Sequence, residues 1–119
     1  MKKFLIIFLM SIVLCGCNNN VETKKQYLNQ TELNTIISEN NYIIIDVRTK
    51  EEYDELHIKN AINIPYDKIN ENSEIDKNKI IFVYCKSGKR SKIAYETLVN
   101  LGYIVYDLQG IDDIALDKE

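Results

Sequence analysis

Residues 85–91 read Cys-Lys-Ser-Gly-Lys-Arg-Ser, and this short segment separates two regular elements. The run before it, Ile80 to Tyr84, is β-branched and aromatic, which predicts a buried strand. The run from Ser91 to Leu101 has apolar residues at helical spacing and stops at Gly102, which predicts a helix. Cys85 is therefore expected at a turn that leads from a strand into a helix.

Such a turn would stabilise negative charge at the cysteine. Its successive backbone N–H groups point inward, and the positive end of the helix dipole lies beneath them. Lys86, Lys89 and Arg90 add positive charge to the same segment. Both effects favour the thiolate over the thiol, and they can lower the pKa of a cysteine from about 8.5 to about 3.5–7.5. Cys85 is therefore the candidate nucleophile.

The segment at Cys85 resembles the active-site loop of the single-domain rhodanese-like sulfurtransferases. Further segments match that family in the expected order, and together the similarity covers residues 27–114. A single match of this kind is weak evidence, but four in the right order identify the family. The other matching segments are 45–48 with 51–53, 57–58 with 61–65, and 101–103 with 108–110.

The resemblance implies an α/β domain of three layers, with a central, mainly parallel sheet flanked by helices. The sequence independently favours this class, because predicted strands alternate with helices over short connections. Asn-x-x-Glu and Thr-x-x-Glu capping patterns predict the starts of two of the helices. Besides the two elements at Cys85, we predict strands over 42–47, 61–64 and 103–108, a short edge strand at 27–28, and helices over 29–40 and 49–55.

The resemblance also implies a reaction. The Cys85 thiolate would take the outer sulfur of thiosulfate or of a persulfide, hold it as a persulfide, and pass it to a thiol or another thiophilic acceptor. The backbone and charges of the loop would bind the small anionic donor, without a metal or an organic cofactor. The loop residues expected to do so are Lys86, Ser87, Gly88, Lys89 and Arg90.

Two other residues are expected to support the site. Asp46 lies near the end of an apolar strand, where a buried carboxylate must be paired or solvated. Because the carboxyl ends of parallel strands meet at one edge of a sheet, Asp46 and Cys85 are expected at the same edge. Arg48 is expected to form a stabilising ion pair with Glu52, four residues further on.

Two alternatives to sulfur transfer stay open. Phosphatases of this fold also use a cysteine and an arginine, but they place five residues between them, whereas four residues separate Cys85 from Arg90. The shorter loop favours sulfur over a phosphoryl group. The other alternative is a non-catalytic binding or sensing module at a membrane surface. The presence of both Cys85 and Arg90 favours catalysis over that role.

The first residues have the pattern of an export signal. Met1-Lys2-Lys3 is basic, and the apolar run over 4–14 is shorter than the roughly 20 residues of a spanning helix. Leu14-Cys15-Gly16-Cys17 resembles the lipobox of bacterial lipoproteins, which implies cleavage before Cys17 and attachment of lipid to it. An uncleaved anchor, or a metal or redox site at Cys15 and Cys17, is the alternative.

These features predict three parts: a signal peptide at 1–16, a lipidated N-terminus and polar tether at 17–26, and a rhodanese-like domain at 27–119. The expected protein is a monomer, exported and anchored by lipid to a bacterial membrane. Removing the two signal lysines from the 15 basic residues leaves 13 against 18 acidic ones, which gives no indication of nucleic-acid binding. Cys85 would then have no disulfide partner within the chain.

Overall fold

Four strands form the central sheet in the computed structural model, which describes residues 25–119. They lie in the order β2-β1-β3-β4, and each neighbouring pair is parallel. The predicted parallel sheet is therefore confirmed. The predicted signal peptide, Cys17 and most of the tether lie outside the described residues. The strands are β1 (Tyr42–Asp46), β2 (Ile62–Asn63), β3 (Ile80–Cys85) and β4 (Ile104–Gly110).

Two of the helices begin at the capping boxes that the sequence predicts. Asn29 and Glu32 exchange side-chain and backbone hydrogen bonds at the start of α2, and Thr49 and Glu52 do the same at the start of α3. α2 ends where Asn40 adopts a left-handed backbone with φ of 54°. The α-helices are α2 (Gln30–Glu39), α3 (Lys50–Glu55) and α4 (Lys89–Asn100), and the short 3-10 helices are η2 (Tyr66–Lys68) and η3 (Ile111–Asp113).

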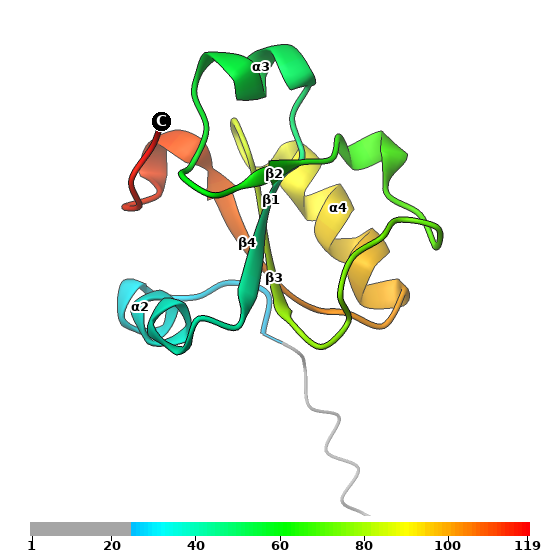
Figure 1. Ribbon diagram of the computed structural model, residues 1–119, viewed down its shortest axis with the longest axis horizontal. Helices are drawn as coiled ribbons and strands as arrows, with labels where there is room; N and C mark the ends of the chain where they lie inside the picture. Colours follow the sequence, from blue (N-terminus) through cyan, green and yellow to red (C-terminus); the bar gives the residue numbers. More distant parts are fainter. Residues whose placement is uncertain (1–24) are drawn as a thin grey trace, which may run out of the picture.

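Helices cover both faces of the sheet, as Figure 1 shows. α4 and η2 lie on one face, over a core that includes Val83, Ala94 and Leu98. α2 and η3 lie on the other, over a core that includes Leu33 and Phe82. Along β3, successive side chains alternate between these two cores, with Val83 in the first and Phe82 in the second, as a strand buried on both sides requires. The predicted three-layer α/β architecture is confirmed.

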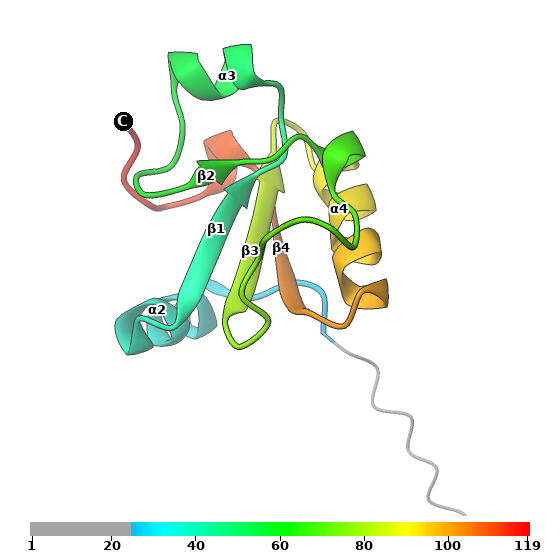
Figure 2. The ribbon, with the colours of Figure 1, turned by 45° about the vertical axis from the view of Figure 1, so that its right-hand side comes forward.

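The third helix lies at one end of the sheet instead of on a face. In Figure 2, the arrowheads of β1 and β3 point to the same end of the sheet, and α3 lies there. β1 leads into α3 and β3 leads into α4, so the two connections meet at the carboxyl edge of neighbouring strands. This edge is where ligands bind in open parallel sheets.

The structure differs from the sequence predictions at two short strands. Residues 27–28 are not a strand, because among residues 25–119 the segment before α2 makes a single backbone bond to the edge of β4, from Asp107 N–H to Gln26 O at 2.8 Å. The strand predicted over 61–64 is reduced to β2, which ends two residues before Pro65, a residue without a backbone N–H.

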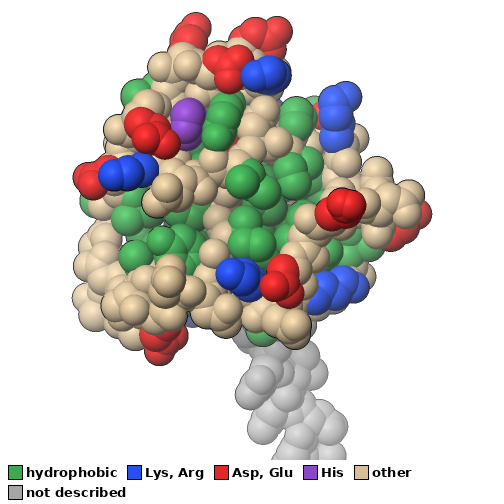
Figure 3. All heavy atoms as spheres, in the orientation of Figure 1, with side chains coloured by type: hydrophobic (Ala, Val, Ile, Leu, Met, Phe, Trp, Pro, Cys, Tyr) green, Lys and Arg blue, Asp and Glu red, His purple; other side chains and the backbone are tan. Residues whose placement is uncertain are grey.

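The face that carries β2 exposes apolar side chains near its centre, with charged groups around them (Figure 3). Ile62 of β2 is 43% exposed. Among residues 25–119, no helix has both the length and the apolar character needed to cross a bilayer. The same residues contain no cluster of three or more histidine, cysteine or acidic side chains placed to bind a metal ion.

Candidate active site

Cys85 is the last residue of β3, and its side chain is fully buried under the turn into α4. The turn reverses at Gly88, whose φ of 98° is in the left-handed region that favours glycine. This conformation directs two N–H groups at the sulfur: Gly88 N–H donates to Cys85 Sγ at 3.0 Å and Ser91 N–H donates at 3.3 Å. The strand, the glycine and the first turn of α4 thus build a cradle of donors around Sγ.

A hydroxyl group completes the cradle. Ser91 is fully buried, and its Oγ lies 3.5 Å from Cys85 Sγ and 3.2 Å from Gly88 O. From the sequence, Ser91 is expected only at the start of a helix. The available signal was its position in the first turn of that helix, where N–H groups have no partner within the helix.

The protonation of Cys85 depends on two opposing effects. Burial raises the pKa of its thiol, because it disfavours the charged form. Hydrogen bonds from the Ser91 hydroxyl and from the N–H groups of Ser91, Gly88 and Ser87 oppose burial and outweigh it. The pKa of Cys85 is therefore below its ordinary value, which favours a thiolate.

The loop also carries exposed side chains. Lys86, Ser87 and Lys89 are exposed, and neither lysine forms an ion pair with any residue that the structure describes. Backbone N–H groups of Gly88 and Ser91 donate to Sγ, and the binding of a sulfur donor by Lys86 to Arg90 stays a prediction. The two lysines supply positive charge at the surface above the cradle.

Arg90 binds an acid on a different element. Its Nη1 and Nη2 donate to the two carboxylate oxygens of Glu52 in α3, at 2.7 Å and 3.0 Å. The predicted pair between Arg48 and Glu52 is therefore wrong. Arg48 precedes the N-cap Thr49 and is not yet helical, so the four-residue spacing of a helix does not bring it to Glu52. The ion pair at Glu52 instead ties α3 to the active-site loop.

The same ion pair fixes the charge of Glu52. The hydrogen bond from Arg90 is the main cause that lowers the pKa of Glu52 to about 2, with burial opposing it and bonds from Thr49 adding to it. The pKa of Glu52 in the folded protein is lower than that of an ordinary glutamate. The ion pair between Arg90 and Glu52 therefore stabilises the fold above about pH 4.5. That contribution is lost as the pH falls from there toward 2.

Asp46 and Arg48 bind each other in the interior. Arg48 donates to Asp46 from its backbone N–H at 2.9 Å, from Nε at 2.9 Å and from Nη2 at 2.6 Å. Tyr84 donates its hydroxyl to Asp46 Oδ2 at 2.7 Å and accepts from Ile58 N–H at 3.0 Å. Asp46 makes its side-chain bonds within this group and not with the loop. The pair thus supports the end of β3 next to Cys85 through Tyr84.

Comparison with known proteins identifies the family of the fold. The family model of the rhodanese-like domain matches residues 29–112, which include both α3 and the Cys85 loop. The chain belongs to the rhodanese-like domain family. Thiosulfate sulfurtransferase PspE of Escherichia coli is 41% identical to it over 78 residues, which cover 62% of this chain and 75% of that protein.

The chain is also similar to other members of the rhodanese-like family. Thiosulfate sulfurtransferase GlpE of Coxiella burnetii is 38% identical over 77 residues, covering 63% of this chain and 72% of that protein. A solved rhodanese with anions from E. coli has a TM-score of 0.60 and 37% identity, over 66% of this chain and 96% of that one. At the level of the family, these relatives support a rhodanese-type sulfurtransferase.

In this rhodanese-like domain, the loop packs closely on the end of β4. A Cβ atom at Gly110 would lie 2.6 Å from Lys86 O, closer than real Cβ contacts come. The next residue back, Gln109, has φ of 70° and packs beside Gly88. Only glycine at position 110 lets the backbone of β4 approach the loop this closely, so β4 helps to fix its shape.

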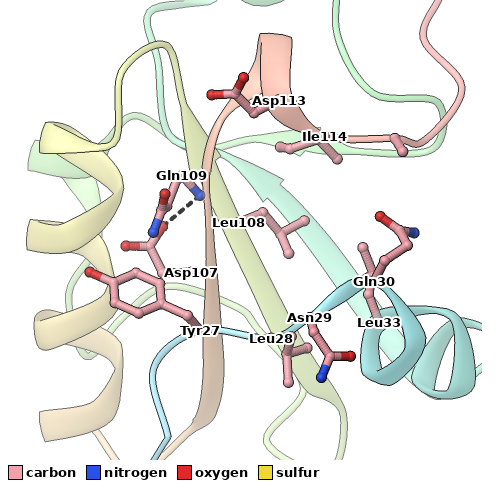
Figure 4. A pocket seen from close by; sticks show the side chains of 11 residues that line it. Tyr27, Leu28, Asn29, Gln30, Leu33, Asp107, Leu108, Gln109, Asp113 and Ile114 are labelled. Carbon is pink, nitrogen blue, oxygen red and sulfur yellow. Dashed lines mark hydrogen bonds between the residues drawn. The ribbon is translucent and has the colours of Figure 1, made fainter.

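A separate cavity lies between β4 and the N-terminal segment. Its volume is about 210 Å³, and Figure 4 shows Tyr27, Asp107 and Gln109 among its lining residues. Buried Asp107 accepts from Gln109 N–H at 2.8 Å and from Gln26 Nε2 at 3.4 Å. Cys85 does not line this cavity, which is therefore distinct from the sulfur cradle.

Proposed function

We propose that this protein transfers sulfane sulfur from thiosulfate or a persulfide donor to a thiophilic acceptor through a Cys85 persulfide. The observation that carries the proposal is the cradle: a buried sulfur that accepts two N–H bonds and lies beside a hydroxyl at the start of a helix. Two relatives bear the name thiosulfate sulfurtransferase. The cradle stabilises a negative sulfur, which both halves of this reaction require.

In the first half-reaction, the Cys85 thiolate attacks the outer sulfur of thiosulfate. Its electron pair forms a new S–S bond, while the S–S bond of thiosulfate breaks and its electron pair leaves with sulfite. The product is the Cys85 persulfide, whose outer sulfur carries negative charge. The exposed charges of Lys86 and Lys89 attract the anionic donor and favour release of sulfite.

In the second half-reaction, a thiolate or another thiophile attacks the outer sulfur. A bond forms between acceptor and sulfur, the persulfide bond breaks, and the electron pair returns to Cys85 as the thiolate. The N–H groups of Gly88 and Ser91 stabilise that leaving thiolate. No proton, metal or external electron is consumed in either step.

Arg90 has a different role from the two lysines. Its guanidinium already binds both carboxylate oxygens of Glu52, so much of its charge is balanced. It therefore holds the loop against α3, and the lysines provide the charge that is available to the donor. This division of roles belongs to the proposal.

The first test is mass spectrometry of the purified chain after incubation with thiosulfate. We expect the mass to increase by one sulfur atom, the extra sulfur to map to the peptide that contains Cys85, and a thiol to remove it as its own persulfide. Prior alkylation with iodoacetamide is the control, since it blocks the thiolate before the donor arrives.

The alternatives predict other results in the same assay. A binding or sensing module would form no persulfide with either thiosulfate or an organic persulfide. A phosphatase would hydrolyse an aryl phosphate at a robust rate without acquiring sulfur. Either result would exclude the proposed transfer reaction.

We further propose that the protein is exported, anchored through lipid on Cys17, and monomeric, with its acceptor on the same side of the membrane. The lipobox-like sequence 14–17 supports lipidation. Two or more acyl chains hold a protein on a bilayer much more firmly than one does.

The Cys17→Ser variant tests the anchor. We expect metabolic labelling with a palmitate analogue in a bacterial host to mark the wild type and to leave Cys17→Ser unlabelled and without normal processing of its signal. Cys15→Ser is the matched control, because only the last cysteine of a lipobox receives lipid, and it should label normally. Equal labelling of wild type and Cys17→Ser would exclude lipid attachment at this residue.

A further inference from the structure

The Ser91 hydroxyl can donate its proton to either of two acceptors, whereas each backbone N–H at the sulfur has a fixed direction. Its Oγ lies 3.5 Å from Cys85 Sγ and 3.2 Å from Gly88 O, and the residue is fully buried. A hydroxyl has one proton to donate and lone pairs with which to accept. It can therefore donate to the sulfur or to the carbonyl, but not to both fully at once.

The charge of the sulfur decides between these partners. When Cys85 is a thiol, its S–H donates to Ser91 Oγ, and the Ser91 O–H donates to Gly88 O. When Cys85 is a thiolate, it has no proton to donate and its negative charge attracts a donor, so the O–H turns to Sγ. Gly88 O stays bonded in both states, because Lys92 N–H donates to it at 3.1 Å. The switch therefore leaves no buried group without a partner.

We infer that Ser91 is a further catalytic residue of the sulfur-transfer reaction, and that its hydroxyl turns to donate to Cys85 Sγ whenever that sulfur is a thiolate. This inference rests on the proposed function and assigns a role that the backbone donors do not share. Ser91 acts on Cys85 both before the donor is attacked and when the persulfide is broken.

The two half-reactions respond to this hydrogen bond in opposite ways. A donor on Sγ increases the thiolate fraction but makes each thiolate less nucleophilic, because intrinsic nucleophilicity falls as the thiol pKa falls. The same donor makes Cys85 a better leaving group, because a thiol of lower pKa leaves faster. Ser91 thus speeds the second half-reaction, discharge of the persulfide to the acceptor, at every pH. It speeds the first half-reaction, loading of sulfur from the donor, only where protonation of Cys85 limits the rate.

The Ser91→Ala variant separates these effects, since it removes the hydroxyl and keeps the backbone N–H at Sγ. Loss of a hydrogen bond to a charged group should lower the thiolate fraction about tenfold on the acid side of the titration. The remaining thiolate should be about threefold more nucleophilic. Alkylation by iodoacetamide should thus be about threefold slower at acid pH and about threefold faster on the alkaline plateau, so the two pH profiles cross.

The rate of persulfide discharge in Ser91→Ala should decrease at every pH. We expect transfer from the preformed Cys85 persulfide of Ser91→Ala to a small thiol to be about threefold slower across the pH range, because the leaving thiolate is more basic. At alkaline pH the variant should load sulfur from thiosulfate faster and release it more slowly. Its persulfide should therefore accumulate to a higher level during turnover than that of the wild type.

Two controls isolate the hydroxyl at Sγ. Thr97→Ala removes another α4 hydroxyl, which donates to Ile93 O at 3.0 Å. It should leave the pH profiles of alkylation and of persulfide discharge unchanged. Ser91→Thr keeps a hydroxyl and should show the wild-type pH profile of alkylation. Circular dichroism verifies that this variant is folded. The ultraviolet absorbance of the thiolate, as a difference from Cys85→Ser, measures the titration without any reagent entering the site.

The outcomes are distinct. Crossed alkylation profiles with slowed discharge support the inference. Parallel profiles, lowered by the same factor at all pH values, would assign Ser91 a structural role and overturn it. Since alkylation and absorbance need no sulfur donor, crossed profiles in a protein that never forms a persulfide would refute the proposed function while retaining the hydroxyl switch.

Discussion

Cys85→Ser is expected to abolish sulfur transfer from thiosulfate, leaving only the rate measured without protein. A serine hydroxyl at position 85 would lie under the same N–H groups of Gly88 and Ser91. It would nevertheless stay protonated at neutral pH, and it could not form a persulfide, whereas thiolates are strong nucleophiles near neutral pH. The measurement is a steady-state assay of sulfite release, with mass spectrometry of the chain in parallel.

The fold should survive this substitution. The exchange of sulfur for oxygen is small, and serine can accept the bonds that the sulfur accepts. Circular dichroism and the midpoint of urea unfolding should therefore remain close to the wild-type values. Thr97→Ala, which changes a hydroxyl far along α4, is the activity control and should transfer sulfur normally. Transfer by folded Cys85→Ser would mean that another group carries the sulfur and that the site is wrongly assigned.

Local sequence rules were sufficient for much of the scaffold. The two capping boxes at Asn29 and Thr49 depend on residues three positions apart, and both formed as the pattern predicts. The apolar runs that became β1 and β3 were also recognisable, because a strand buried on both faces has few polar residues. The carboxyl edge that holds Cys85 followed from the order of these elements.

The contacts that shape the loop could not be derived from local rules. The pairing of Arg90 with Glu52 joins residues 38 positions apart, so it depends on how α3 lies against α4. The close approach of Gly110 to Lys86 O likewise requires the register of β4 beside β3. Ser91 could be placed in a helix, but its distance to Sγ depends on the reversal at Gly88.

Asp46→Ala is expected to lower the free energy of unfolding by about 3–5 kcal/mol, because it removes one partner of a buried ion pair. Arg48 is 5% exposed, so its guanidinium would keep its charge in the interior with the carbonyl of Leu56, at 2.6 Å, as its remaining acceptor in the described structure. The hydroxyl of Tyr84, which is 0% exposed, would also lose the acceptor of its proton. Since small domains are stable by about 5–15 kcal/mol, this loss is a large fraction of the total.

Urea unfolding at neutral pH measures the effect, and an exposed ion pair provides the matched control. Lys50 and Asp54 of α3 form an i,i+4 pair with side chains 75% and 55% exposed, so Asp54→Ala should cost at most about 0.5 kcal/mol. The loss in free energy of unfolding for Tyr84→Phe should lie between these two values, at about 1–3 kcal/mol, because the substitution leaves the buried Ile58 N–H without its acceptor. If Asp46→Ala costs no more than Asp54→Ala, the buried carboxylate does not hold Arg48 and Tyr84 in place. The support of β3 beside Cys85 must then come from apolar packing alone.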